Sequence, residues 1–77
     1  MRYVLVTDDS CLVSLTAKRW ANDKAVEIVD INECESVIDL YDVGRLPTLL
    51  AIGDYGVIHG RLNGFNKAFY DSMYAGI

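Results

Sequence analysis

Three scarcities in this 77-residue chain limit what it can be. Its longest apolar stretches, such as Leu49–Ile52, are too short to cross a bilayer, and the N-terminus lacks the apolar core and cleavage site of a signal peptide. The two cysteines, Cys11 and Cys34, stand 23 residues apart, and the single His59 adds no cluster, which argues against a metal site. We therefore expect a cytoplasmic protein without membrane contact, bound metal or cofactor.

Positive charge is also scarce. The formal net charge is −4, which argues against a protein that binds nucleic-acid phosphates. Residues 30–42 carry five acidic side chains and no basic one: Asp30, Glu33, Glu35, Asp39 and Asp42. This segment is either the solvated face of a helix or a docking surface for a basic partner protein, and the sequence leaves both interpretations open.

What remains is the composition of a small globular protein. Apolar residues make up 52% of the chain and charged residues 23%, which is neither disordered nor membrane-spanning. Residues 1–77 are enough for one domain with a thin core, so we expect a small margin of stability.

The first half of the chain predicts a strand, a helix and a second strand. Residues 3–7 are rich in β-branched and aromatic side chains, residues 11–22 have helical periodicity, and residues 25–31 again indicate a strand. Three residues are candidate caps of this helix: Asp8, Asp9 and Ser10. Its expected inner face holds Val13, Ala17, Trp20 and Ala21, with Leu12 and Leu15 beside them. Such a unit makes the two strands parallel.

The second half predicts a short helix at about 35–42, strands at 48–52 and 57–62 joined as a hairpin, and a last helix at about 67–74. Phe69 and Met73 are expected on the inner face of that helix. The order is β-α-β-α-β-β-α. It predicts an α/β fold in which three helices flank a four-stranded mixed sheet.

The run Tyr41-Asp42-Val43-Gly44-Arg45-Leu46-Pro47-Thr48-Leu49-Leu50 resembles the thioredoxin segment that leads into a cis-proline. Cys11 follows the first strand and starts the first helix, where this superfamily has its nucleophile. The resemblance implies a minimal thioredoxin fold of glutaredoxin size. It also implies that Cys11 is the catalytic residue.

The resemblance further implies a site with one thiol. The family's second cysteine is replaced by Ser14, whose hydroxyl can donate a hydrogen bond to a Cys11 thiolate. Such a site forms a mixed disulfide with glutathione or a protein thiol, and an external thiol must then release it. Cys34 is either an ordinary loop cysteine or a resolving thiol at the same edge of the sheet.

Two influences on Cys11 oppose each other. The open N–H groups and dipole of a helix N-terminus favour the thiolate, whereas the neighbouring Asp8 and Asp9 disfavour it. The sequence does not decide between them.

A substrate-binding groove beside Cys11 is implied by the same resemblance. Its expected residues are Leu46, Pro47, Thr48, Gly64 and Phe65. Leu46 would offer its backbone to an extended substrate, and Pro47 would be cis. Gly64 and Phe65 would form the facing wall, although core packing is an equal interpretation of Phe65.

Two functions follow from these features. The first is thiol–disulfide exchange through Cys11, with protein thiols, protein disulfides or glutathione as partners. The alternative is a redox-inert binding module that uses the cis-proline groove or the acidic segment 30–42. The retained Cys11 and Leu46-Pro47-Thr48 favour the first function. The family's second cysteine is absent, its tryptophan before the nucleophile is replaced by Ser10, and its buried aspartate is absent from Val4-Leu5-Val6, which favours the alternative.

Overall fold

Four strands and two α-helices form the described part of the chain in this computed structural model, which describes residues 1–33, 36, 39 and 43–75. The order is β1 (Arg2–Thr7), α1 (Leu12–Ala21), β2 (Glu27–Asp30), β3 (Thr48–Ile52), a 3₁₀ turn η1 (Asp54–Gly56), β4 (Ile58–Asn63) and α3 (Lys67–Tyr74). The helix expected at about 35–42 falls mostly on residues outside the described ones. No helix within the described ranges is long and apolar enough to cross a membrane.

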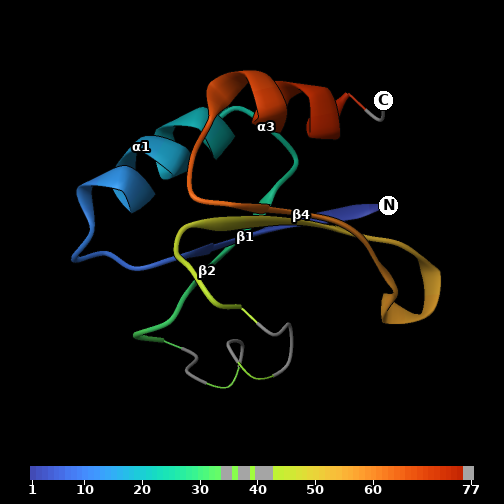
Figure 1. Cartoon of the computed structure of the whole chain (residues 1–77), viewed down its shortest axis with the longest axis horizontal. Coiled ribbons are helices and arrows are strands. Elements are labelled where there is room, and N and C mark those ends of the chain that lie inside the picture. The colour runs from blue at the N-terminus through green and yellow to red at the C-terminus, as the bar shows by residue number, and fades with distance from the viewer. Residues whose placement is uncertain (34–35, 37–38, 40–42, 76–77) are drawn as a thin grey trace.

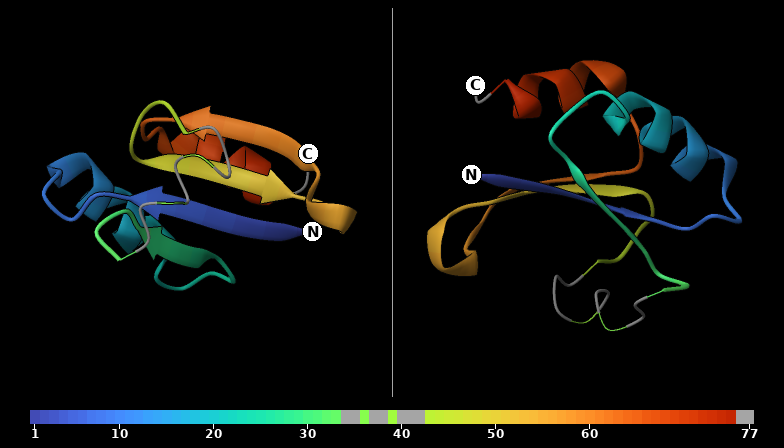
Figure 2. Two further views of the ribbon diagram at one scale, coloured as in Figure 1. Left: turned by 90° about the horizontal axis from the view of Figure 1, so that it is seen from below. Right: turned by 180° about the vertical axis from the view of Figure 1, so that it is seen from behind.

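The sheet is mixed, as predicted. Its strand order is β2-β1-β3-β4, where β1 pairs with β2 in parallel and with β3 antiparallel, and β3 pairs antiparallel with β4 (Figure 2, left). The parallel pair confirms the expected crossover through α1. The predicted bounds of β3 and α3 agree with the structure. β2 is shorter than the predicted 25–31, because the Ala25 N–H bonds the Tyr74 hydroxyl at 2.9 Å instead of joining the sheet.

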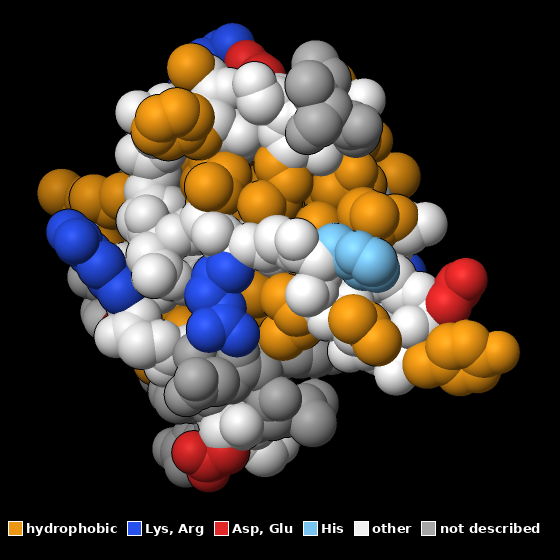
Figure 3. Space-filling view, turned by 45° about the vertical axis from the view of Figure 1, so that its right-hand side comes forward, with side chains coloured by type: hydrophobic (Ala, Val, Ile, Leu, Met, Phe, Trp, Pro, Cys, Tyr) orange, Lys and Arg blue, Asp and Glu red, His pale blue; other side chains and the backbone are white. Residues whose placement is uncertain are grey.

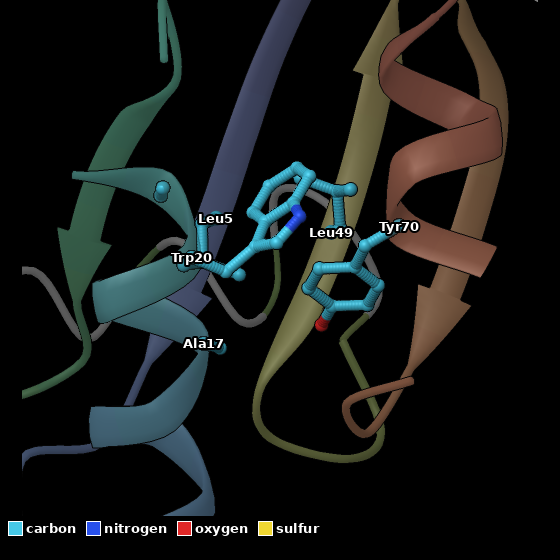
Figure 4. Close-up of a cluster of buried hydrophobic side chains, with 6 residues drawn as sticks. Leu5, Ala17, Trp20, Leu49 and Tyr70 are labelled. Carbon is cyan, nitrogen blue, oxygen red and sulfur yellow. The ribbon is translucent and has the colours of Figure 1, made fainter. Parts of the chain in front are cut away.

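α1 and α3 lie on the same face of the sheet (Figure 1). The core between them and the strands is made of Leu5, Ala17, Trp20, Ala21, Leu49 and Tyr70. Figure 4 shows the Trp20 and Tyr70 rings between the two helices and the sheet, and their centroids are 5.1 Å apart in an edge-on arrangement. The indole N–H of Trp20 donates to Asp71 at 2.7 Å, so its one polar atom is satisfied on burial.

A second cluster covers the opposite face of the sheet. It comprises Val4, Val6, Val43, Leu50 and Ile52, with Leu46 among the partly buried side chains packed against it. Val43 and Leu46, which precede β3 in the chain, therefore pack on this side of the sheet. All of β3 is buried, which explains its unbroken apolar run, because a strand covered on both faces shows no alternation of polar and apolar residues.

The predicted inner face of α1 is wrong at Val13, and the residues expected beside it, Leu12 and Leu15, are exposed as well. Val13 is 47% exposed and Leu12 80% exposed, whereas Ser14 is fully buried beside Ala17 and Trp20. The physical reason is a backbone group that needs a partner. The Ser14 hydroxyl accepts a hydrogen bond from the Asp8 N–H at 3.1 Å, and this polar contact sets the rotation of the helix.

Of the two residues predicted on the inner face of α3, one is misplaced. Phe69 is 62% exposed, and Tyr70 takes the buried position, while Met73 packs against the core as expected. Tyr70 satisfies its hydroxyl by donating to the Gly64 carbonyl. Asn66 begins the helix and accepts from the Phe69 N–H at 3.2 Å, which fixes where α3 starts and hence which residues face the sheet.

Candidate functional site

The candidate site lies at the end of the sheet where the strands β1 and β2 finish and β3 begins; we call this row of strand ends the edge. The pairing places Thr7 of β1 opposite Asp30 of β2, and Thr48 of β3 opposite Val6 of β1 and Asn63 of β4. Cys11, Pro47 and Gly64 each lie within four residues of this row. Segments far apart in the sequence therefore meet at one edge, as the sequence predicts.

Cys11 is the N-terminal cap of α1. Its backbone is extended, its N–H bonds the Asp8 carbonyl at 2.9 Å, and its carbonyl accepts from Leu15 at 3.2 Å. None of the predicted caps, Asp8, Asp9 or Ser10, holds this position. The Cys11 side chain is half-buried and makes no capping hydrogen bond, so the thiol stands at the helix N-terminus as a free cysteine.

Ser14 has a different partner from the one expected. Instead of a bond to the Cys11 thiol, its buried hydroxyl has the Asp8 N–H as donor. Asp8 and Cys11 are also joined through their backbones. Ser14 thus anchors the turn that carries Cys11, because it satisfies the first backbone N–H after β1.

Asp8 and Asp9, which precede Cys11, both have polar partners. Asp8 accepts from the Ser10 hydroxyl at 2.7 Å and the Ser10 N–H at 3.0 Å, and these bonds lower the pKa of the Asp8 carboxyl. Asp9 forms an ion pair with Lys18, seven residues after Cys11 on α1. The hydrogen bond to Asp9 raises the pKa of Lys18, so the ammonium is charged at neutral pH.

Asp30 is a buried carboxylate at this end of the sheet. The sequence places it in the acidic segment 30–42, expected to be exposed, and that expectation is wrong for Asp30. It is 4% exposed and accepts from the Thr7 hydroxyl at 3.2 Å and from the Asn32 N–H and amide at 2.9 and 2.8 Å. Lys18 lies 3.7 Å away. The available signal was its place as the last residue of the strand parallel to β1, at the end of the sheet from which the chain leads to Cys11. Of the other acidic residues in that segment, Glu33 and Asp39 are exposed, and positions 35 and 42 lie outside the described residues.

We expect Asp30 to shape the acid stability of the protein. Burial raises the pKa of its carboxyl, but the hydrogen bonds from Asn32 and Thr7 outweigh burial and lower it below 3.8. A carboxyl with a lowered pKa in the folded state stabilises above its unfolded pKa and loses this contribution as pH falls through its folded pKa. The free energy of unfolding, measured with denaturant as a function of pH, should therefore fall below about pH 4. Asp30→Asn should make this fall shallower.

A matched variant separates this effect from simple damage. Thr7→Val removes one bond to Asp30 and should make the loss of unfolding free energy at acid pH smaller, because the pKa of Asp30 in the folded state then rises toward its unfolded value. If the free energy of unfolding fell identically at acid pH in wild type, Asp30→Asn and Thr7→Val, the role given to Asp30 would be contradicted.

The cis-proline loop closes the other side of the site. The Leu46–Pro47 peptide bond is cis, as the resemblance to thioredoxin implies, and the Pro47 carbonyl accepts from the Gly64 N–H at 2.7 Å. Gly64 has φ +75°, a conformation that favours glycine. Thr48 is fully buried, and its hydroxyl contacts the Arg45 carbonyl and, at 3.2 Å, the Asn63 side chain. Thr48 therefore supports the loop from inside and offers no free face to a substrate.

Phe65 packs into the core, one of the two interpretations made from the sequence. Its ring centroid lies 4.9 Å from that of Tyr70, at an interplanar angle of 78°. The side chain is half-buried and belongs to the cluster under α1 and α3. Of the predicted groove residues, Pro47, Thr48 and Gly64 are brought together by bonds, and Leu46 packs on the opposite face of the sheet. Cys34 lies outside the described residues, so its role as a resolving thiol stays a prediction.

An apolar hollow of about 370 Å³ lies at the other end of the sheet. It is lined by Met1, Ala51, His59, Gly60, Leu62, Phe69, Ser72 and Met73. Figure 3 shows apolar side chains gathered next to the pale blue histidine on this face. Met1 precedes β1 whereas Cys11 follows it, so the hollow is separate from the predicted groove. The described residues contain no group of three metal-ligating side chains that could hold an ion.

Comparison with known proteins gives matches in structure alone. No family model matches the sequence, and no curated protein does. Among solved structures, reduced thioredoxin pre-protein from Schistosoma mansoni matches with a TM-score of 0.79 and 23% identity over 97% of this chain and 78% of that one. Oxidised mitochondrial thioredoxin 3 from Saccharomyces cerevisiae matches with a TM-score of 0.75 and 15% identity, over 97% of this chain and 76% of that one.

A third structure gives the same TM-score as the yeast thioredoxin. It is a chain solved for the thiol resolving mechanism of yeast mitochondrial 1-Cys peroxiredoxin via the glutathione and thioredoxin systems, with a TM-score of 0.75 and 16% identity over 97% of this chain and 76% of that one. The chain has the thioredoxin fold.

Proposed function

We propose that this protein carries out thiol–disulfide exchange through the single thiol of Cys11. The observation that supports this most is the position of Cys11 as the cap of α1, half-buried, with its side chain free of any capping bond. A thiol there faces the open N–H groups of the first helical turn, which stabilise a thiolate. No acidic residue lies in that first turn to oppose them.

The proposed step is a simple exchange. The Cys11 thiolate attacks one sulfur of a disulfide, a Cys11–sulfur bond forms, the original sulfur–sulfur bond breaks, and the second half leaves as a thiolate. The partner is a protein disulfide or oxidised glutathione. Since position 14 is a serine, an external thiol must attack the mixed disulfide to restore Cys11.

A second function has its own observation. Leu12 and Val13, next to Cys11, are 80% and 47% exposed, and exposed apolar side chains favour contact with another protein. In this alternative the chain is a redox-inert binding module, and Cys11 has no chemical role. In the acidic segment 30–42, also proposed as a docking surface, Glu33 and Asp39 are exposed and Asp30 is buried, and positions 35 and 42 lie outside the described residues.

One experiment separates the two functions. The Cys34→Ser protein is incubated with oxidised glutathione near neutral pH, and the intact mass is followed; Cys34→Ser combined with Cys11→Ser is the control. We expect one glutathione adduct in the first protein, none in the second, and complete loss of the adduct on addition of a reducing thiol. Absence of the adduct, together with no exchange on a protein disulfide such as that of insulin, would leave only the binding function.

A further inference from the structure

Among the described residues, Lys18 is the one basic side chain of α1 that forms an ion pair with the turn before Cys11. Cys11, Ser14 and Lys18 are spaced by three and four residues, so they lie on one stripe of the helix. We propose that Lys18 is a positioning residue for the exchange reaction: it offsets the carboxylates of Asp9, two residues before Cys11, and of Asp30, at the same end of the sheet, and so allows the thiolate to form. This inference rests on the proposed function of Cys11.

The contacts of Lys18 tie three parts of the site together. Its ammonium pairs with Asp9 in the turn and lies 3.7 Å from the buried Asp30 at the end of β2. The Lys18 side chain is about one quarter exposed, more shielded than an ordinary surface ion pair. Asp9 is only two residues before Cys11, so Lys18 also restrains the turn that carries the thiol.

The local charge balance gives Lys18 its effect. The acidic groups at this edge are Asp8 and Asp9 of the turn, Asp30 of β2, and Glu33, whose charge also acts on Lys18. Arg45, exposed before Leu46, is the basic residue of the cis-proline loop. Without Lys18, Asp9 and Asp30 would both act on Cys11 uncompensated, and like charge disfavours a thiolate.

The test compares Lys18→Met and Lys18→Arg in the Cys34→Ser background, by the rate of iodoacetamide alkylation of Cys11 across pH. We expect Lys18→Met to react about fivefold more slowly near neutral pH and to reach the wild-type rate at high pH, where the thiol is fully ionised. The gap should shrink in about 1 M salt, where the Debye length is about 3 Å. Lys18→Arg keeps the charge and should react like wild type.

Lys67→Met is the matched control. Lys67 also forms an ion pair on a helix, with Asp71, but on α3. It should leave the alkylation profile unchanged. A purely structural role of Lys18 would instead change the high-pH rate, or the rate at every pH alike, and that result would overturn the proposal.

Asp9→Asn tests the same charge effect on Cys11 if Lys18→Met does not fold. This change removes one carboxylate from an exposed position and should speed alkylation near neutral pH by about two- to fivefold. An unchanged rate would overturn the proposal. Alkylation needs no disulfide partner, so this result is distinct from failure of the exchange function, which the glutathione adduct measures.

Discussion

Ser14→Cys, in the Cys34→Ser background, is expected to release a glutathione adduct from Cys11 without any external thiol. Position 14 is fully buried, three residues after the cap, with its side chain toward the Asp8 N–H in the Cys11 turn. Side chains three apart on a helix lie about 5–6 Å apart at Cβ, within reach of a disulfide after a small adjustment. The new thiolate attacks the Cys11 sulfur, an intramolecular disulfide forms, and glutathione leaves as a thiolate.

The expected size of this effect is large. A thiol held beside its target competes with one in solution at a high effective concentration, so release should be faster by roughly two orders of magnitude or more. The measurement is the decay of the adduct by intact mass after excess glutathione has been removed. Ser14→Ala is the matched control, because it also removes the hydroxyl that bonds Asp8 but adds no thiol.

Retention of the adduct in Ser14→Cys for as long as in Ser14→Ala would contradict the geometry described for the Cys11 turn. Release from both variants would instead show that the adduct is labile without any second thiol. The loss of the Asp8 contact is common to the two proteins, so a difference between them reports on the thiol alone.

Tyr70→Ala is expected to unfold most of the protein. Tyr70 is fully buried and lies between the rings of Trp20 and Phe65, at centroid distances of 5.1 and 4.9 Å. Removal of a buried aromatic ring costs about 3–5 kcal/mol. Small domains have a total stability of about 5–15 kcal/mol, and a 77-residue chain is expected near the lower end.

Tyr70→Phe isolates the hydroxyl from the ring. Burial raises the pKa of Tyr70 far above its ordinary value, so the hydroxyl stays protonated and donates to the Gly64 carbonyl. Loss of that one hydrogen bond should cost about 1 kcal/mol. Urea unfolding followed by circular dichroism measures both variants. Equal stabilities for Tyr70→Ala and Tyr70→Phe would contradict the assigned role of the ring.

The sequence predicted the elements well because their signals are local. β3 is an unbroken apolar run after the single proline, and its bounds agree with the structure. The N-terminal cap of α3 is Asn66, a residue type that commonly begins helices and so gives a local signal. The cis peptide before Thr48 was expected from the resemblance to the thioredoxin segment that leads into a cis-proline.

The rotation of the helices was harder to predict because it depends on distant partners. Hydrophobicity alone favours Val13 over Ser14 for burial, yet only the serine can satisfy the Asp8 N–H. Phe69 and Tyr70 are adjacent aromatic residues, and the Gly64 carbonyl, six residues before Tyr70, decides that the tyrosine is buried. Asp30 was misplaced for the same reason, since Thr7 and Asn32 together make its burial favourable.

The pairing irregularity between β3 and β4 bears on self-association. β4 is an outer strand of the sheet, and its register with β3 shifts between Ala51 and Ile52. A shifted register bends and twists an outer strand, and the exposed His59 and Arg61 place polar side chains along it. A second copy would therefore find no flat surface on which to add its own strand. We expect this end of the sheet to resist the strand-to-strand stacking through which small β-containing proteins aggregate.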